Sequence, residues 1–251
     1  MTTLKGLIIK EEPKGESSKL IYVLTAEKGV ISILVRGGMK SSKNSASTQL
    51  YVYSELCFEE KKDAKGYSFY YLNSSEPISM FFELRLDIYK MALAAYLSEL
   101  LFYSRIEAAD DKNEILRLAL NTFYFINQGK KDRELLKSIF EFRLICDTGF
   151  RPNLIGCNKC YKVEDERMYL NMRAGSLECE ECCTNKESMF GFVLDRQMLH
   201  IVRHITLTDF ERLFTLQITP QYQAALTDLT ERYVKFHFKE KFPTLNFYRS
   251  L

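Results

Sequence analysis

The sequence predicts an α+β protein of several domains, in which an N-terminal β-barrel is followed by an all-α helical bundle that carries a small cysteine-rich insert. Three observations predict this fold class. Apolar segments rich in Ile, Val, Leu, Tyr and Phe fill residues 1–75, and a helical pattern begins after Glu76-Pro77. Two pairs of cysteines then interrupt the helical pattern between residues 157 and 182. We therefore divide the chain into parts at residues 1–77, 78–150, 151–187 and 188–251.

Five strands are expected in the first part. Turn-like connectors separate the strand segments, and the connector at residues 36–49 is the longest. Five strands with one long link between the third and the fourth fit a closed barrel of the OB type, although a generic small β-barrel fits the pattern almost as well. The expected strands are residues 4–10, 19–25, 29–35, 50–58 and 67–73.

Helices are expected on both sides of the cysteines. Residues 80–103 are apolar nearly all round and contain neither Gly nor Pro, which indicates a buried central helix. Segments 111–129 and 133–149 each end at a glycine, a typical stop signal. Thr208 predicts a helix N-cap, and Pro220 suits the first position of a last helix.

The composition excludes several classes of protein. The chain has 251 residues, of which 46% are apolar, and a formal net charge of +2, so the overall charge indicates no partner. Residues 80–103 carry charges at five positions, too many for a membrane-spanning helix. The first residues show no secretory signal and the seven cysteines are an odd number, which argues against a disulfide framework and for the reducing cytoplasm.

Four cysteines form the most specific motif of the chain, C-x2-C-x18-C-x2-C. A gap of two residues lets both sulfurs of a tight knuckle reach one ion at about 2.3 Å, and two knuckles complete a tetrahedron. The spacer lies within the range of zinc sites. The segment therefore predicts a zinc ribbon with one structural Zn²⁺ per chain, and the expected ligands are Cys157, Cys160, Cys179 and Cys182. Cys183 is an alternative fourth ligand.

Other interpretations of these cysteines are weaker. Polar neighbours disfavour their burial as plain apolar groups, and a redox dithiol needs only one C-x2-C pair. Four thiolates leave no open coordination position, so the ion would brace the fold and would not catalyse. Cys57 and Cys146 are expected in the core.

No constellation of catalytic residues is recognisable. The phosphate loop, the G-x-G-x-x-G fingerprint and the deaminase signature are all missing from the sequence. His200 and His204 are spaced i, i+4, which would allow a metal site, but such a pair more often belongs to an ordinary packed or half-exposed helix. We expect no enzymatic activity.

Basic residues are concentrated in the first 45 residues, where eight Lys and Arg oppose four Glu. Several of them lie at expected strand ends, where they could meet phosphates, and the barrel aromatics offer rings for base stacking. An ordinary solvated barrel surface is the alternative, because strand alternation turns half of the aromatics inward. The residues expected to contact nucleic acid are Lys10, Lys14, Lys19, Arg36, Lys40 and Lys43.

Two stretches resemble the bacterial RecO family. Residues 6–44 combine an apolar first strand, a Gly15-Glu16-Ser17 turn, a hairpin from Thr25 to Gly29 and a basic Arg36-Gly37 after the third strand. The stretch FEFRLICDTGFRPNLIGCNKC at 140–160 is similar to the junction between helix and cysteines in that family. The order of barrel, helices, cysteine insert and helices also agrees.

The resemblance implies a mediator of DNA repair and homologous recombination with no chemistry of its own. RecO-like proteins bind single- and double-stranded DNA and anneal complementary strands. With RecR they help to load RecA on strands coated by single-stranded-DNA-binding protein. The implied partners are thus DNA, RecR, the tail of the coating protein and, indirectly, RecA, and the implied location is the cytoplasm at the nucleoid. A zinc-ribbon module for protein interaction or transcription, without direct DNA binding, is the competing expectation.

Overall fold

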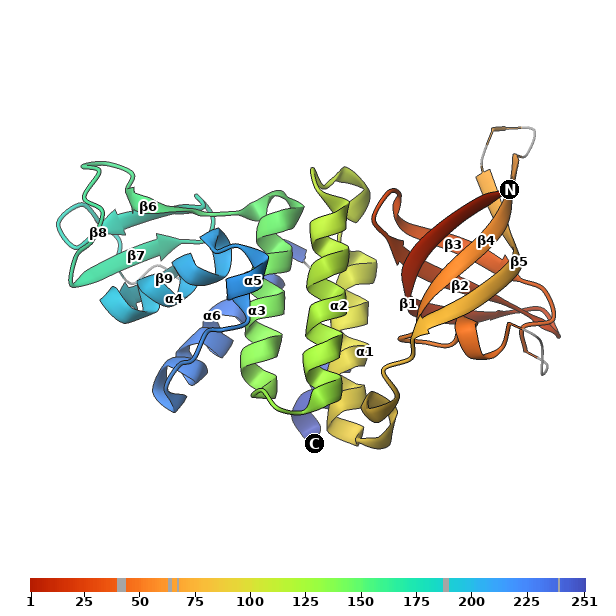
Figure 1. Cartoon of the computed structure of the whole chain (residues 1–251). Coiled ribbons are helices and arrows are strands. Elements are labelled where there is room, and N and C mark those ends of the chain that lie inside the picture. The colour runs from red at the N-terminus through yellow and green to blue at the C-terminus, as the bar shows by residue number, and fades with distance from the viewer. Residues whose placement is uncertain (40–43, 63–64, 67, 187–189, 239) are drawn as a thin grey trace. The chain divides into compact units, whose positions relative to one another are not determined.

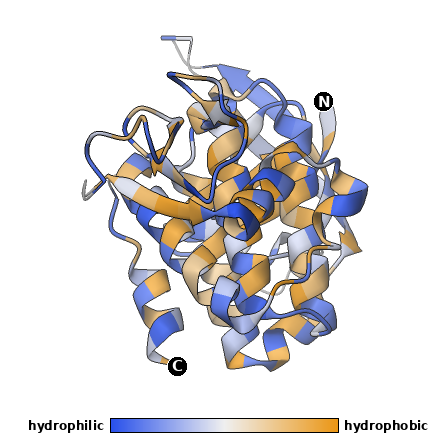
Figure 2. Ribbon diagram, turned by 90° about the vertical axis from the view of Figure 1, so that its left-hand side faces the viewer, coloured by the Kyte–Doolittle hydropathy of each residue, from blue (hydrophilic) through white to orange (hydrophobic). Residues whose placement is uncertain are grey.

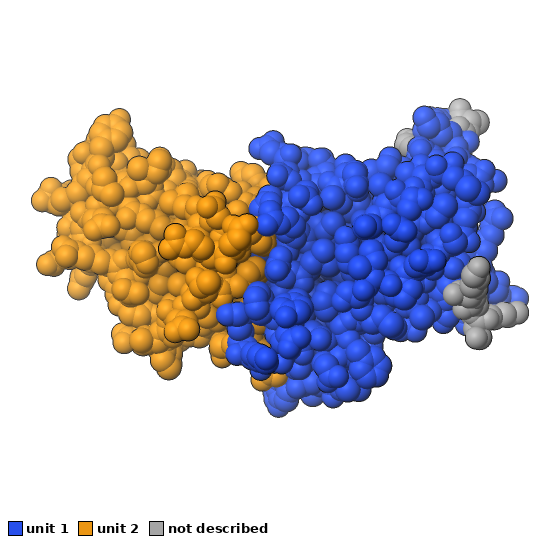
Figure 3. Space-filling view, viewed as in Figure 1, with its two compact units in different colours: residues 1–131, 242–251 blue, residues 132–241 orange. Residues whose placement is uncertain are grey.

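The computed structural model describes residues 1–39, 44–62, 65–66, 68–186, 190–238 and 240–251 (Figure 1). They form two compact units, one of residues 1–131 and 242–251 and the other of residues 132–241 (Figure 3). The first unit holds the barrel with three α-helices, and the second holds the cysteine segment with its own helices. The division into four parts at residues 77, 150 and 187 stays a prediction.

Five strands close the N-terminal barrel in the order β1-β2-β3-β5-β4. β1 pairs antiparallel with both β2 and β4, and β3 pairs parallel with β5. This topology, with the long link between β3 and β4, is that of an OB-type barrel, so the predicted fold class is confirmed. The strands are β1 (Thr2–Lys14), β2 (Ser18–Thr25), β3 (Gly29–Val35), β4 (Tyr53–Lys62) and β5 (Ser68–Ser79).

Strand alternation fills the interior of the barrel. Ile21 and Val23 on β2 and Ile31, Ile33 and Val35 on β3 point into one buried cluster, as side chains two residues apart on a strand must. β1 is buried on both faces at its middle, because α1 and α2 contact the face that does not line the barrel. Apolar burial of this kind stabilises the barrel without any bound ion.

Aspartates cap the two long helices of the first unit. Asp87 accepts hydrogen bonds from the backbone N–H groups of Tyr89 and Lys90 at the start of α1 (Ile88–Tyr103). Asp111 caps α2 (Lys112–Gln128), which ends at Gly129 with a φ of 68°, as the sequence predicts. The short α7 (Pro243–Ser250) packs against α1.

The boundary between strand and helix differs from the prediction. β5 continues through Pro77 to Ser79, because its pairing with β4 shifts register near this proline and tolerates the missing N–H. A 3₁₀ turn (Phe82–Leu86) follows, so the central helix begins at Ile88 and not at residue 80. From Ala92 to Leu101 the helix is buried nearly all round, as its apolar sequence predicts, whereas Ile88, Tyr89, Met91 and Tyr103 at its ends are exposed.

The second unit combines a four-stranded sheet, in the order β6-β8-β7-β9, with four α-helices. Figure 2 shows hydrophilic and hydrophobic residues alternating along the helices. Asp195 caps α4, and Thr208 ends α4 and does not cap the next helix. The elements are α3 (Arg133–Ile145), β6 (Asn153–Cys157), β7 (Arg167–Asn171), β8 (Ser176–Cys179), β9 (Gly191–Asp195), α4 (Arg196–Leu207), α5 (Phe210–Leu213) and α6 (Pro220–Phe238).

A buried ionic cluster joins α3 to α6. Lys137 is fully buried, and its ammonium lies 2.6 Å from Glu231 and 3.2 Å from Glu141. Thr230 donates a hydrogen bond of 2.6 Å to Glu141. Removal of the lysine would leave two carboxylates facing each other in a site with little water.

In the described part of the chain, no helix combines the length and apolar character needed to cross a bilayer.

Candidate metal centre and nucleic-acid surface

The sheet of the second unit brings two knuckles together. Cys157 is the last residue of β6 and Cys179 is the last residue of β8, and these strands are parallel neighbours. Each knuckle then turns back on itself, since Tyr161 N donates to Cys157 O at 2.9 Å and Cys182 N donates to Cys179 O at 3.1 Å. The second cysteine of each pair is thereby directed toward the first.

The geometry of the four sulfurs fits one tetrahedral ion. The Sγ atoms of Cys157, Cys160, Cys179 and Cys182 all lie within 4.8 Å of one another, and the Cys160 and Cys179 sulfurs are 3.6 Å apart. Four ligands at about 2.3 Å from a zinc ion stand about 3.8 Å apart. All seven cysteines of the chain are free thiols, so no disulfide competes for these sulfurs.

The four thiols also influence one another electrostatically. Burial opposes ionisation of Cys157, but hydrogen bonds from backbone N–H groups of the two knuckles outweigh it and lower the pKa of this thiol to about 6. Hydrogen bonding with the Cys179 and Cys160 side chains raises the pKa of Cys182 to about 12. Four thiolates held this closely repel one another, and a divalent cation removes that repulsion when it binds.

Cys183 lies outside this group of four. Its backbone N–H donates to Cys179 O at 3.0 Å, and burial raises the pKa of its thiol. The geometry therefore favours Cys182 over Cys183 as the fourth ligand. The thiol of Cys146 is buried at the start of the π-helical turn (Cys146–Phe150) that follows α3, and Cys57 is half-buried on β4.

Arg203 of α4 clamps the segment that surrounds the first knuckle. Its guanidinium donates to the carbonyl oxygens of Leu154, Ile155 and Val163 at 2.7 to 2.9 Å. These bonds cover the outer edge of β6 and tie it to α4. The sequence offers no signal for this role, because Arg203 stands 43 or more residues after the first knuckle.

The two histidines of α4 do not join the cysteines. His200 is exposed, and His204 Nε2 lies 3.2 Å from the carbonyl oxygen of Arg212. Among the described residues, the cluster with ligand atoms at metal-binding distance contains neither of them. This geometry favours His200 and His204 as ordinary helix residues over a metal site.

The basic residues expected to bind nucleic acid differ in their surroundings. Lys14 and Arg36 are exposed. Lys10 forms an ion pair of 2.7 Å with Glu12 and stands 4.0 Å above the ring of Phe102. Lys40 and Lys43 lie outside the described residues.

Lys19 differs from these residues because its side chain is buried and bonds to other groups of the barrel. Only 7% of its surface is exposed, and its ammonium lies 2.7 Å from both Glu11 and the carbonyl oxygen of Thr48. This arrangement fastens the loop after β3 to β1 and β2. We therefore remove Lys19 from the set of proposed phosphate contacts.

A cation-rich aromatic patch covers the outside of β5. Tyr71 lies beneath two cations, with Arg36 at 4.9 Å and Lys61 at 5.5 Å from its ring centre. Phe69, two residues earlier on the same face, is 49% exposed. Lys28 is not part of this patch, because it stands 5.5 Å from the ring of Tyr70, which packs against the barrel core. The residues predicted from the sequence to contact nucleic acid did not include Lys61, although its place near the end of an expected strand was a usable signal.

Comparison with known proteins agrees with this architecture. The family model for the N-terminal part of recombination protein O matches residues 1–81, and the model for its C-terminal part matches residues 85–246. The DNA repair protein RecO of Caldicellulosiruptor bescii is 29% identical over 98% of this chain and 96% of its own length. RecO of Caldicellulosiruptor saccharolyticus is 28% identical over the same shares, and RecO of Clostridium acetobutylicum is 30% identical over 71% of this chain and 70% of its own length.

Proposed function

This chain belongs to the RecO family, and from that membership we propose that it acts in DNA repair and homologous recombination by binding single- and double-stranded DNA and annealing complementary strands. The observation that carries this proposal is the match of both family models across the barrel and the cysteine-bearing helical part. The activity needs no covalent chemistry, in keeping with a chain whose sequence contains no recognisable catalytic motif.

The outer face of β5 is the surface that we propose for DNA. Arg36 and Lys61 supply positive charge beside the ring of Tyr71, and Phe69 on the same face is 49% exposed. Cations of this kind displace condensed counterions from phosphates, and exposed rings accept stacked bases regardless of sequence. Lys10, Lys14 and the pair Lys40 and Lys43 extend the proposed contacts. Two strands held on one such surface meet at a raised effective concentration, which favours annealing.

The metal centre has a supporting role in this proposal. We propose that Cys157, Cys160, Cys179 and Cys182 hold one Zn²⁺, which supplies four bonds that fix the two knuckles. Since four thiolates complete the coordination of the ion, substrate has no place on it. The sheet of the second unit then keeps a defined surface for a partner.

Membership of the family supports the partners that we propose. We propose that the chain works with RecR, contacts the tail of single-stranded-DNA-binding protein and so assists the loading of RecA in the cytoplasm, at the nucleoid. The competing proposal is a zinc-ribbon module for protein interaction that does not touch DNA.

Annealing of complementary oligonucleotides, naked and coated with single-stranded-DNA-binding protein, tests the proposed function. Purified protein should accelerate annealing of both, and its affinity for a labelled single strand should fall as salt rises. Failure to bind any oligonucleotide in dilute buffer would reject the proposal and favour the protein-interaction module.

A further inference from the structure

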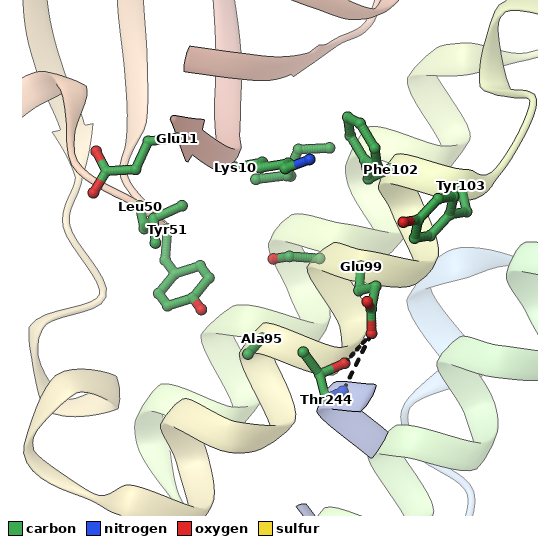
Figure 4. A pocket seen from close by; sticks show the side chains of 11 residues that line it. Lys10, Glu11, Leu50, Tyr51, Ala95, Glu99, Phe102, Tyr103 and Thr244 are labelled. Atoms are coloured by element: carbon green, nitrogen blue, oxygen red, sulfur yellow. Dashed lines mark hydrogen bonds between the residues drawn. The ribbon is translucent and has the colours of Figure 1, made fainter. Parts of the chain in front are cut away.

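A hollow of about 220 Å³ lies within the first unit, between the barrel and α1 (Figure 4). One face of α1 forms its floor through Ala95, Ser98, Glu99 and Phe102, which follow helical i, i+3, i+4, i+7 spacing. The barrel contributes Ile9 to Glu11 of β1 with Leu50 and Tyr51, and α7 contributes Thr244. Pockets for drug-sized ligands begin at about 300 Å³, so this hollow suits a smaller occupant.

The lining contains polar groups that the protein leaves unused. Ser98 is 3% exposed, and its Oγ has no hydrogen-bond partner among the described residues. A serine in a helix usually donates to the carbonyl group of the preceding turn, so an unpaired and buried hydroxyl here is unusual. Thr244 bonds to Oε2 of Glu99 through its hydroxyl and its backbone N–H, which leaves Oε1 of Glu99 as an acceptor.

Two of the charges at the hollow have ion-pair partners, since Lys10 pairs with Glu12 and Glu11 pairs with Lys19. Glu99 bonds to the neutral Thr244, so its carboxylate disfavours an anion in the hollow. The aromatic and aliphatic walls of the hollow, with hydroxyl donors and a carboxylate acceptor, suit a neutral and flat molecule that can form hydrogen bonds.

Tyr51 has a backbone conformation that favours a ligand site. Its φ is 65°, a left-handed value that bulky residues rarely adopt, and such residues cluster where ligands are held. Its backbone N–H donates to the Ile8 carbonyl group at 2.8 Å, which fixes the turn. Burial raises the pKa of its hydroxyl to about 12. Like any tyrosine hydroxyl at neutral pH, it is protonated and can donate.

We infer that this hollow receives one unstacked nucleobase of a bound single strand, an inference that rests on the proposed DNA binding. The rim supports this occupant, since Lys10 borders the hollow and Lys14 is exposed farther along the same strand. Phosphates along β1 would thus lie outside while the base packs against Phe102 and Tyr51 and bonds to Ser98 and Glu99. A base held in this way cannot stack on its neighbours, so the strand is presented unstacked for pairing.

Binding of two oligonucleotides with the same number of phosphates tests the inference. The probes are oligothymidylate and its fully abasic analogue, measured by fluorescence anisotropy on the full chain. Ala95→Leu fills the floor of the hollow and should weaken oligothymidylate binding roughly five- to a hundredfold, the range for loss of one base stack, without changing abasic binding. Ala225→Leu, at a half-buried site on α6, adds the same atoms elsewhere and should change neither affinity.

Ser98→Ala keeps the test independent of packing, because it removes only the unpaired hydroxyl. It should weaken oligothymidylate binding roughly two- to tenfold and leave abasic binding unchanged. Unaltered oligothymidylate affinity in the folded Ala95→Leu variant, or in Ser98→Ala if the first does not fold, overturns the inference and leaves the proposed function intact. Failure of the unmodified protein to bind either probe at low salt rejects the proposed function, and the inference with it.

Discussion

In the barrel of the first unit every strand has a neighbour on both sides, whereas the sheet of the second unit is open at β6 and β9. Closure pairs the barrel's backbone groups and encloses an aliphatic core. The open sheet is secured by side chains, since Arg203 covers carbonyl groups of β6 and Arg232 donates to Gly191 of β9 at 3.1 Å. Its knuckles converge on a cluster of four thiols close enough together to hold one metal ion. One β structure is therefore stable by topology and burial, and the other by specific contacts.

Loss of the metal should produce the largest difference in stability between the barrel and the sheet of the second unit. Cys160→Ser should lower bound zinc from one per chain to none and should expose the amides of the second unit's sheet to hydrogen exchange, because structural zinc is worth on the order of 10 kcal/mol in small domains. The barrel amides should keep their protection. Cys183→Ser is the matched control and should retain one zinc. Equal metal content in both variants would contradict the assignment of ligands.

Lys137→Met should destabilise the second unit by about 3–5 kcal/mol, because Glu141 and Glu231 would face each other without their buried cation. Urea denaturation followed by circular dichroism measures this loss. Lys235→Met on the exposed side of α6 should change stability little. Similar effects at both positions would show that the buried pairing contributes nothing.

Lys19→Ala should destabilise the barrel by about 1.5–3 kcal/mol, since its buried ammonium bonds to a carboxylate and a carbonyl group. The salt dependence of DNA binding should not change. Lys14→Ala should leave the stability of the barrel unchanged and should reduce the salt slope of DNA binding. A reduced slope for Lys19→Ala would return this residue to the DNA surface.

Removal of Arg36 and Lys61 together should lower the affinity for every single-stranded sequence and reduce the slope of log K against log salt by about 1.4. Titrations between low and moderate salt measure the slope. The double variant Lys235→Ala, Lys241→Ala removes the same charge from the second unit and should leave the salt slope of DNA binding unchanged. Removal of Lys40 and Lys43 together should also lower the affinity and reduce the salt slope. If neither double removal in the first unit changed the slope, the DNA-binding surface would have to lie on another part of the protein.

The smallest effect is expected at His237. Burial lowers the pKa of its imidazole, which packs against Phe150 and Tyr233 with ring centres 4.6 and 4.4 Å away. The unfolded chain therefore binds the proton more readily, so the stabilisation is complete above a pH of about 6.5 and is lost as the pH falls through the lowered value. His237→Gln should flatten the stability profile below pH 6.5 in thermal melts. Parallel profiles would indicate that this imidazole does not contribute.

Local sequence patterns predicted much of the molecule. Alternating Ile and Val predicted the strands of the barrel, Gly129 predicted the end of α2, and the spacing of four cysteines predicted a cluster that the structure assembles. Each of these signals depends on residues close together in the chain, because period, capping and knuckle geometry are short-range properties.

Tertiary structure alone decided which polar groups were available. Lys14 and Lys19 look equivalent in sequence, but Thr48 lies close enough to bury and bind only the second. Arg203 reaches the first knuckle, and α1 meets β1 to leave Ser98 unpaired beside a hollow, only after distant segments pack. The sequence by itself determined the barrel strands, the existence of the main helices and the ligand spacing. The accessibility of each charge depended on contacts between segments tens of residues apart, which no local pattern encodes.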